Sequence, residues 1–364
     1  MTNSELGRES RHVLKMPSEL SSFMAHQRQI NSSAMRAFCE AARVHPVVFN
    51  VRVCSRYLGH IGVVFMLLVS PLAAQQRTSG LKFVRLNGIV LRYIDEGHGP
   101  TVVLVHGGME DYRSWEAQIP PLAAHFRVIA YSRRYNYPNS NPLRSDNHSA
   151  IIDADDLAAL IHSLKLGRVH LVGHSYGAYI SLFLAVRHPD LVRSLVLSEP
   201  PIMTWLNDTA EGKPLLDDFM KNMWLPCGIA FRDQHPEAAL RITVDWFASH
   251  ESSPHQPSTT YANLPLEVRS FLMQDIGEWQ ALTTSRDAFP NLPRQDVRKL
   301  RKSVLLLSGS RSVPALKLIA KELAQTLPSV RFVVLQNASH EMWNEVPQEL
   351  TTTILPFLLQ TNLD

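Results

Sequence analysis

The chain has little cysteine and no excess of either charge. Its 364 residues contain three cysteines, Cys39, Cys54 and Cys227, whose spacing gives no CxxC motif and argues against a zinc or redox site. Lys and Arg total 36 against 33 Asp and Glu, so the net charge of +3 lacks the basic excess that nucleic-acid binding needs. We therefore expect neither a disulfide scaffold nor a nucleic-acid partner.

Nucleotide and metal motifs are missing as well. The sequence contains no GxGxxG or GxxxxGKS stretch, which argues against a nucleotide cofactor. His250 and His255 are five residues apart, whereas zinc-binding histidines of a helix are spaced i, i+4. We expect a protein that uses no cofactor and no metal and whose partner is a small-molecule substrate.

Long hydrophobic runs are scarce. The most apolar stretch, Ile61–Ala74, is shorter than the roughly 20 residues that cross a bilayer as a helix, is broken by Pro71 and ends in small residues. This pattern is typical of a signal peptide. We therefore predict an unpatterned leader over residues 1–50, a signal-peptide-like segment over 51–74, and an exported protein cut near Ala74 that keeps no membrane span. An uncleaved anchor or a cytoplasmic protein is the alternative.

From Leu81 onward, short apolar runs alternate with helical patterns, which is typical of a mostly parallel sheet covered by helices. Leu157–Leu164 has the periodicity of an amphipathic helix, and Ala178–Val186 is apolar nearly all round, as in a buried helix. The fold class is therefore α/β with eight strands. The expected strands are Leu81–Leu86, Ile89–Ile94, Thr101–Val105, Arg127–Tyr131, Val169–Val172, Ser194–Leu197, Val304–Leu307 and Arg331–Leu335.

The strand pattern stops between Glu199 and Lys302, where helical segments rich in large apolar side chains are expected instead. Residues 200–302 are predicted to form a helical cap, or lid, inserted after the sixth strand, and 75–199 with 303–364 to form the core. The expected cap helices are near Leu215–Leu225, Pro236–Ala248 and Pro265–Leu282. The candidates for the substrate pocket are Trp205, Met223, Trp224 and, outside the cap, Met342.

The strongest local motif is GHSYG at Gly173–Gly177, between an apolar strand and a buried helix. So sharp a strand-to-helix turn strains the backbone of Ser175, and only glycines two residues to either side let the neighbouring chain pass closely. Ser175 is therefore the predicted nucleophile.

With this motif in place, residues 81–359 resemble the α/β-hydrolase fold family. The segment HGGM after the third strand resembles the family's oxyanion loop, which implies the N–H of Gly108, or else of Met109, as one oxyanion donor and the N–H of Tyr176 as the other. A histidine that opens such a glycine turn usually holds the loop, so His106 is expected to have a structural role. The segment NASHEM after the last strand also resembles the family, and this match implies His340 as the catalytic base.

The acid is where this sequence departs from the commonest pattern of the family, in which an aspartate follows the seventh strand. Here that position holds Ser312, which cannot carry the charge that steadies an imidazolium. Some members place the acid after the sixth strand, which ends here at Glu199, so Glu199 is the predicted acid. The alternatives are Asp296, Asp217, Asp218 or no acid.

Two further features are expected to be structural. Ser132–Tyr135 follows the fourth strand, where relatives often carry an Asp-x-Arg turn, and is interpreted as loop scaffolding, with substrate contact as the alternative. Cys227 is interpreted as a small buried hydrophobe, because no histidine is positioned to activate it.

Together the motifs predict a serine hydrolase that cleaves a small or medium uncharged carboxylic ester through an acyl-enzyme. A serine nucleophile argues against epoxide hydrolases and haloalkane dehalogenases, which need a carboxylate at this position. A carbon–carbon bond hydrolase, a lactonase and a perhydrolase share the triad and stay open. A ligand-binding or receptor protein on the same fold is the non-enzymatic alternative.

Overall fold

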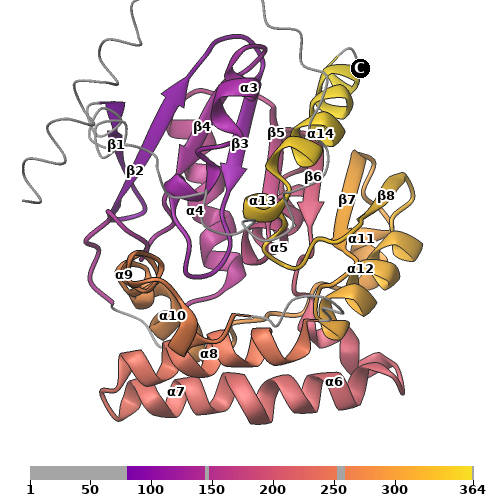
Figure 1. Ribbon diagram of the computed structural model, residues 1–364. Helices are drawn as coiled ribbons and strands as arrows, with labels where there is room; N and C mark the ends of the chain where they lie inside the picture. Colours follow the sequence, from indigo (N-terminus) through magenta and orange to yellow (C-terminus); the bar gives the residue numbers. More distant parts are fainter. Residues whose placement is uncertain (1–79, 144–146, 252–258, 363–364) are drawn as a thin grey trace, which may run out of the picture. The chain divides into compact units, whose positions relative to one another are not determined.

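The eight short apolar runs form a single sheet in the computed structural model, which describes residues 80–143, 147–251 and 259–362 (Figure 1). All of these residues belong to one of the two units into which the chain divides, Val69–Asp364. The leader and the signal-peptide-like segment predicted from the sequence lie outside the described residues. In the described ranges, no helix is long and apolar enough to cross a membrane.

The strand order is β1-β2-β4-β3-β5-β6-β7-β8, and all eight predicted strands are present. The β1/β2 and β2/β4 pairs are antiparallel, and every pair from β4 to β8 is parallel. Central strands such as β3 are buried along their whole length, as expected of a parallel sheet with helices on both faces. The strands are β1 (Lys82–Leu86), β2 (Ile89–Glu96), β3 (Thr101–Val105), β4 (Arg127–Tyr131), β5 (Val169–His174), β6 (Val192–Ser198), β7 (Ser303–Gly309) and β8 (Val330–Leu335).

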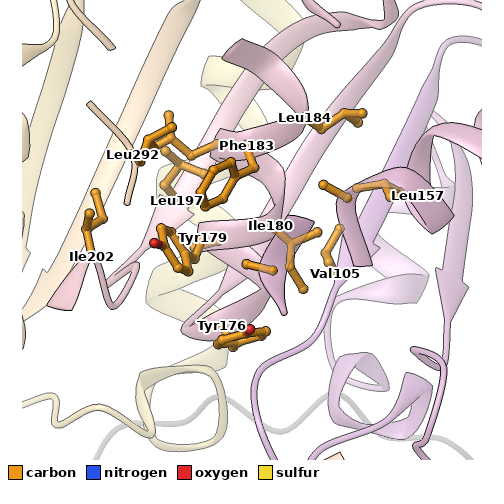
Figure 2. Packing of buried hydrophobic residues seen from close by; sticks show 14 of the residues in the cluster. Val105, Leu157, Tyr176, Tyr179, Ile180, Phe183, Leu184, Leu197, Ile202 and Leu292 are labelled. Carbon is orange, nitrogen blue, oxygen red and sulfur yellow. The ribbon is translucent and has the colours of Figure 1, made fainter. Parts of the chain in front are cut away.

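Two apolar clusters, one on each face, hold the helices to the sheet. The predicted buried helix is α5, and Figure 2 shows its Ile180 in the same cluster as Val105 of β3 and Leu157 of α4. One face carries α4 (Ala150–Ser163), α5 (Tyr176–Arg187) and α12 (Pro314–Thr326), and the other carries α3 (Ile119–Ala123), α13 (Met342–Glu345) and α14 (Pro347–Thr361).

The chain between β6 and β7, residues 200–302, is called the cap segment below. Figure 1 shows its helices α6, α7 and α8 beside the end of the sheet at which β3 and β6 finish. The expected helix over Pro265–Leu282 is in fact two helices, because the chain turns at the buried Asp275. The helices of the segment are α6 (Gly212–Phe219), the π-helical η5 (Met220–Trp224), α7 (Leu225–Arg232), α8 (Pro236–His250), α9 (Leu266–Gln274), α10 (Ile276–Thr283) and α11 (Arg294–Val297). Short 3-10 turns are η2 (Tyr112–Trp115), η3 (Pro189–Leu191), η4 (Met203–Asp208) and η6 (Tyr261–Asn263).

Candidate active site

Ser175 occupies the sharp turn between β5 and α5. Its backbone angles, φ 50° and ψ −121°, lie in a region that side chains rarely adopt. A Cβ at Gly173 would lie 2.7 Å from the Cα of Ala178, and a Cβ at Gly177 would lie 2.1 Å from the carbonyl oxygen of Val105. Both positions therefore require glycine, and the turn presents the Ser175 side chain beyond the carboxyl end of β5.

Glu199, which directly follows β6, is fully buried, and both of its carboxylate oxygens are saturated with donors. Oε1 accepts hydrogen bonds from the Ser308 hydroxyl (2.8 Å) and the Gly309 N–H (2.9 Å). Oε2 accepts from the Ser312 hydroxyl (2.7 Å) and from Nδ1 of His340 (2.7 Å). Burial on its own raises the pKa of Glu199, but His340 and the other donors outweigh burial and hold this pKa below its usual value.

Two of the other acids considered from the sequence, Asp218 and Asp296, are engaged elsewhere, and Asp217 is exposed on α6. Asp218 accepts from the indole N–H of Trp246 (2.9 Å) and lies 2.9 Å from Nε2 of His250. Asp296 pairs with Lys299 at 2.9 Å. The carboxylate that the structure places on the His340 ring is that of Glu199.

The ring of His340 is fixed on three sides. Because Nδ1 faces Glu199, Nε2 is the nitrogen left to act on a substrate or a nucleophile. The ring stacks on Phe247 of α8, with centroids 5.4 Å apart and planes 13° apart, and its centroid is 4.8 Å from that of His174. His340 and Ser175 both line one cavity of about 380 Å³.

A partly buried ion pair lies next to this histidine. Nδ1 of His174 donates to Oε1 of Glu110 (2.8 Å), and Nε2 donates to the backbone oxygen of His340 (3.0 Å). Since both partners are acceptors, both ring nitrogens must carry protons, and His174 is an imidazolium. Burial works against this charge, but Glu110 raises the pKa of His174 to about 9. Burial likewise opposes the charge of Glu110, yet His174 lowers the Glu110 pKa to about 2. Sequence reasoning missed this pair, because nothing in the local pattern connects the two positions.

Of the predicted oxyanion donors, Gly108 and Tyr176 line the cavity, and Tyr176 is the first residue of α5. Met109 also lines the cavity, but its N–H already donates to Oε2 of Glu278 (3.1 Å). The N–H of Met109 is therefore engaged by the cap segment, and Gly108 with Tyr176 is the better candidate pair. A Cβ at Gly108 would come within 2.9 Å of the Trp279 ring, so glycine is required there.

The expected loop-holding role of His106 is confirmed. The residue is buried, and its Nε2 accepts a hydrogen bond from the backbone N–H of Arg133 (2.9 Å). Burial and the neighbouring Arg133 charge lower the pKa of His106 to about 3, so the ring is neutral. Ser132 bridges two loops by donating to the carbonyl of Tyr137 (2.6 Å) and accepting from the N–H of Tyr112 (3.3 Å).

The cavity has an apolar wall supplied by the cap segment. Met223 lies in this wall as predicted, whereas Trp205, Trp224 and Met342 do not. The apolar lining residues of the segment include Met203, Phe219, Met223, Val244, Trp246, Phe247, Leu264, Val268, Leu272, Trp279 and Phe289.

The structure places these three side chains in packing contacts away from this cavity. The indole N–H of Trp205 donates to the carbonyl of Leu292 (2.8 Å), and the Arg294 guanidinium covers its ring. Met342 is fully buried in the cluster on the α14 face of the sheet. Trp224 packs against the rings of Phe219, Trp279 and Phe289.

Several carboxylates also line the cavity, together with the guanidinium of Arg311. Burial and the nearby charge of Glu341 raise the pKa of Glu251 to about 7. The raised pKa of Glu251 indicates that a further negative charge directly beside it would be unfavourable.

The metal and cysteine predictions concern positions away from the cavity wall. Within 80–143, 147–251 and 259–362, no group of His, Cys, Asp and Glu side chains is arranged to hold a metal ion. His250 lies against Asp218 and stacks on Trp246, while His255 is outside the described residues. Cys227 is buried, with its Sγ 3.3 Å from the carbonyl oxygen of Ala239, and burial raises the pKa of its thiol.

Comparison with known proteins gives the same fold. Residues 100–343 match the family described as the alpha/beta hydrolase fold. Epoxide hydrolase 3 of Mus musculus is 24% identical over 76% of this chain and 75% of its own. A putative carbamate hydrolase, RutD, of Pantoea ananatis is 33% identical over 42% of this chain. The matched region covers 53% of that relative, which is about half of its length. The solved structure of a thermophilic esterase from Thermogutta terrifontis superposes with a TM-score of 0.59 at 21% identity, covering 77% of this chain and 97% of that one. The described helices and strands, the turn at Ser175 and the match over residues 100–343 lead to one conclusion: the chain is an enzyme of the α/β-hydrolase fold family.

Proposed function

We propose that this enzyme is a serine hydrolase that cleaves a small or medium uncharged carboxylic ester through an acyl-enzyme. The observation that carries the proposal is the 2.7 Å hydrogen bond from His340 to the buried Glu199, in the same cavity as the strained Ser175. A base oriented by a carboxylate and facing a serine at a sharp turn is the arrangement that activates a serine nucleophile.

The proposed reaction begins with proton transfer from the Ser175 hydroxyl to Nε2 of His340. The serine oxygen attacks the ester carbonyl carbon, and the N–H groups of Gly108 and Tyr176 stabilise the negative charge on the carbonyl oxygen. The tetrahedral intermediate then expels the alcohol, which takes the proton from His340. A water molecule, deprotonated by the same histidine, hydrolyses the acyl-enzyme and restores Ser175. Glu199 stabilises the imidazolium in both steps.

The cavity supports an uncharged substrate of modest size. Its volume of about 380 Å³ lies near the lower end of ligand pockets, and its cap wall is apolar. A substrate with a carboxylate of its own would place a further negative charge near Glu251 and Glu341. Carbon–carbon bond hydrolysis, lactone hydrolysis and perhydrolysis use the same groups and are alternatives within this proposal.

The serine nucleophile separates this enzyme from its epoxide hydrolase relatives. Opening an epoxide through an alkyl-enzyme ester needs a carboxylate nucleophile, and this chain has Ser175 at the turn. We therefore propose acyl chemistry for this enzyme, although its mouse relative is an epoxide hydrolase.

The experiment is mass spectrometry of the intact protein after incubation with a fluorophosphonate, together with hydrolysis of short p-nitrophenyl esters. We expect one adduct on Ser175 and ester turnover, and the loss of both in Ser175→Ala. A folded sample that gives neither adduct nor turnover would contradict the proposal and favour a ligand-binding protein on the same fold.

We further propose that the protein is exported and loses its N-terminal segment. The support is the apolar run Ile61–Ala74 with its small-residue end. N-terminal sequencing of the protein from its native host is expected to begin near Gln75, and a chain that begins at Met1 would overturn export with cleavage.

A further inference from the structure

One buried guanidinium joins the oxyanion loop, helix α4 and the cap segment. Nη2 of Arg133 donates to the backbone oxygen of Gly107 (2.8 Å) and to Oε1 of Glu278 (2.6 Å), and Nη1 donates to Asp153 (2.9 Å). Arg133 is 1% exposed and Glu278 is fully buried. Both charges have lost their hydrogen bonds to water, so the stability of the pair depends on the hydrogen bonds that the protein supplies instead. The arrangement is therefore geometrically demanding.

This contact fixes the direction of the proposed oxyanion donor. The carbonyl of Gly107 and the N–H of Gly108 belong to the same planar trans peptide and point in opposite directions. When Arg133 holds the Gly107 oxygen, it also sets where the Gly108 N–H points. The neutral His106 supports the same plane, because its Nε2 accepts the Arg133 N–H, leaving Nδ1–H to donate to the Gly107 oxygen (2.9 Å).

Glu278 holds the next peptide plane directly. Its second oxygen, Oε2, accepts the N–H of Met109 (3.1 Å), a residue with φ 55°. A side-chain-bearing residue at positive φ is strained by about 1 kcal/mol or more, so the surroundings must maintain it. The two oxygens of Glu278 thus restrain the peptide planes on both sides of Gly108, one through Arg133 and one directly. The next residue of α10, Trp279, packs on Gly108.

We propose that Glu278 is a positioning residue of the oxyanion hole, through which helix α10 of the cap segment aims the Gly108 N–H at the substrate oxygen. This inference rests on the proposed serine hydrolase function. Glu278 is not among the residues that line the cavity, so it acts through Arg133 and Met109 and not on the substrate. Arg133 pairs with Asp153 as well as with Glu278, so its single positive charge offsets only part of the charge of Glu278.

The test replaces Glu278 with an isosteric neutral side chain and separates ground-state binding from transition-state stabilisation. Glu278→Gln keeps the size of the side chain but weakens its hold on Arg133. We expect kcat to fall roughly 10- to 100-fold with KM changed by less than about threefold, because a misaimed donor affects the tetrahedral state and not the bound ester. The affinity for a trifluoromethyl ketone, which forms a tetrahedral adduct with the serine, should fall by a similar factor.

Glu267→Gln on the neighbouring helix α9 is the matched control, because Glu267 is exposed. It should leave kcat, KM and the ketone affinity at wild-type values. Arg133→Lys is the second variant, which keeps the positive charge but cannot donate to Gly107, Asp153 and Glu278 in the same fork geometry. It should give the same selective loss in kcat and ketone affinity, and it decides the question if Glu278→Gln does not fold.

Two results would overturn the inference. The first is a folded Glu278→Gln enzyme with wild-type kcat and ketone affinity. The second is a rise in KM with an equal fall in kcat/KM at constant kcat. This result would indicate a role in substrate binding or general packing only. Failure of the proposed function itself looks different, since the wild-type protein would then form no fluorophosphonate adduct and hydrolyse no ester.

Discussion

The hydroxyl of Ser312 donates a 2.7 Å hydrogen bond to the same oxygen of Glu199 that accepts Nδ1 of His340. Ser312 stands after β7, where the family commonly has its acid, and Glu199 stands after β6. The loops that follow two adjacent strands therefore converge on one point beside His340. Glu199, after β6, supplies the negative charge, and the neutral hydroxyl of Ser312, after β7, stabilises that charge.

If the proposed function holds, replacing Glu199 with glutamine is expected to lower kcat by about 10⁴-fold, as loss of the triad carboxylate does in serine proteases. Each carboxylate oxygen accepts two hydrogen bonds, so an amide nitrogen at either position faces two donors. Steady-state kinetics on a p-nitrophenyl ester measure the effect. An unchanged rate in folded Glu199→Gln would remove this residue from the triad.

A second substitution tests whether the acid can be moved. Because Ser312 lies against the oxygen that contacts His340, Glu199→Gln combined with Ser312→Asp should recover part of the lost kcat. We expect at least about tenfold recovery over Glu199→Gln alone, with Ser270→Asp on the exposed face of α9 as the control that recovers nothing. No recovery in a folded double variant would show that Ser312 cannot place a carboxylate on the ring.

Ser312→Ala is expected to reduce both stability and acid tolerance. The lost bond to a buried charge lowers the free energy of unfolding at pH 7 by about 1.5–3 kcal/mol. Because the folded pKa of Glu199 is below its ordinary value of 4.5, its stabilisation is present above that value and is lost as the pH falls through the folded pKa. Removing a donor raises the folded pKa, so acid unfolding should begin at a higher pH than in wild type. Urea titrations from pH 3 to 8 measure this shift, with Ser270→Ala as control.

Loss of the ion pair between His174 and Glu110 is expected to destabilise the protein in alkali. The folded pKa of His174, about 9, is above its ordinary value of 6.5. Its stabilisation is therefore complete below pH 6.5 and is lost as the pH rises through about 9. The melting temperature should fall between pH 7 and 10 in wild type and fall less in Glu110→Gln, which starts lower because His174 has lost its partner. Equal slopes in the two proteins would contradict this assignment.

The two methionines predicted for the pocket should now behave differently. Met223 lines the cavity, so Met223→Ala is expected to enlarge it and to raise the relative kcat/KM for longer acyl chains. Met342 is buried in the core on the α14 face, so Met342→Ala should cost about 2–5 kcal/mol of stability without changing chain-length preference. A series of p-nitrophenyl esters from acetate to octanoate compares them. The same preference shift in both variants would contradict the placement of Met342.

Much of the fold was readable from the sequence. The eight strands, the buried helix α5 and the turn at Ser175 each depend on neighbouring residues, through apolar runs or glycines two positions away. The resemblance to the family supplied His340, and the carboxylate at the end of the sixth strand pointed to Glu199, whose contact with His340 the structure then displayed. Local patterns are sufficient where local backbone geometry decides the outcome.

The pocket and its supporting contacts were decided only by the tertiary structure. Trp205, Trp224 and Met342 have the same apolar character as Met223, and nothing local distinguishes a side chain that lines a cavity from one that fills the core. The contact between Arg133 and Glu278 joins residues 145 positions apart. A buried pair of this kind exists because folding removes both groups from water and leaves each as the other's partner, which the order of residues along the chain does not encode locally.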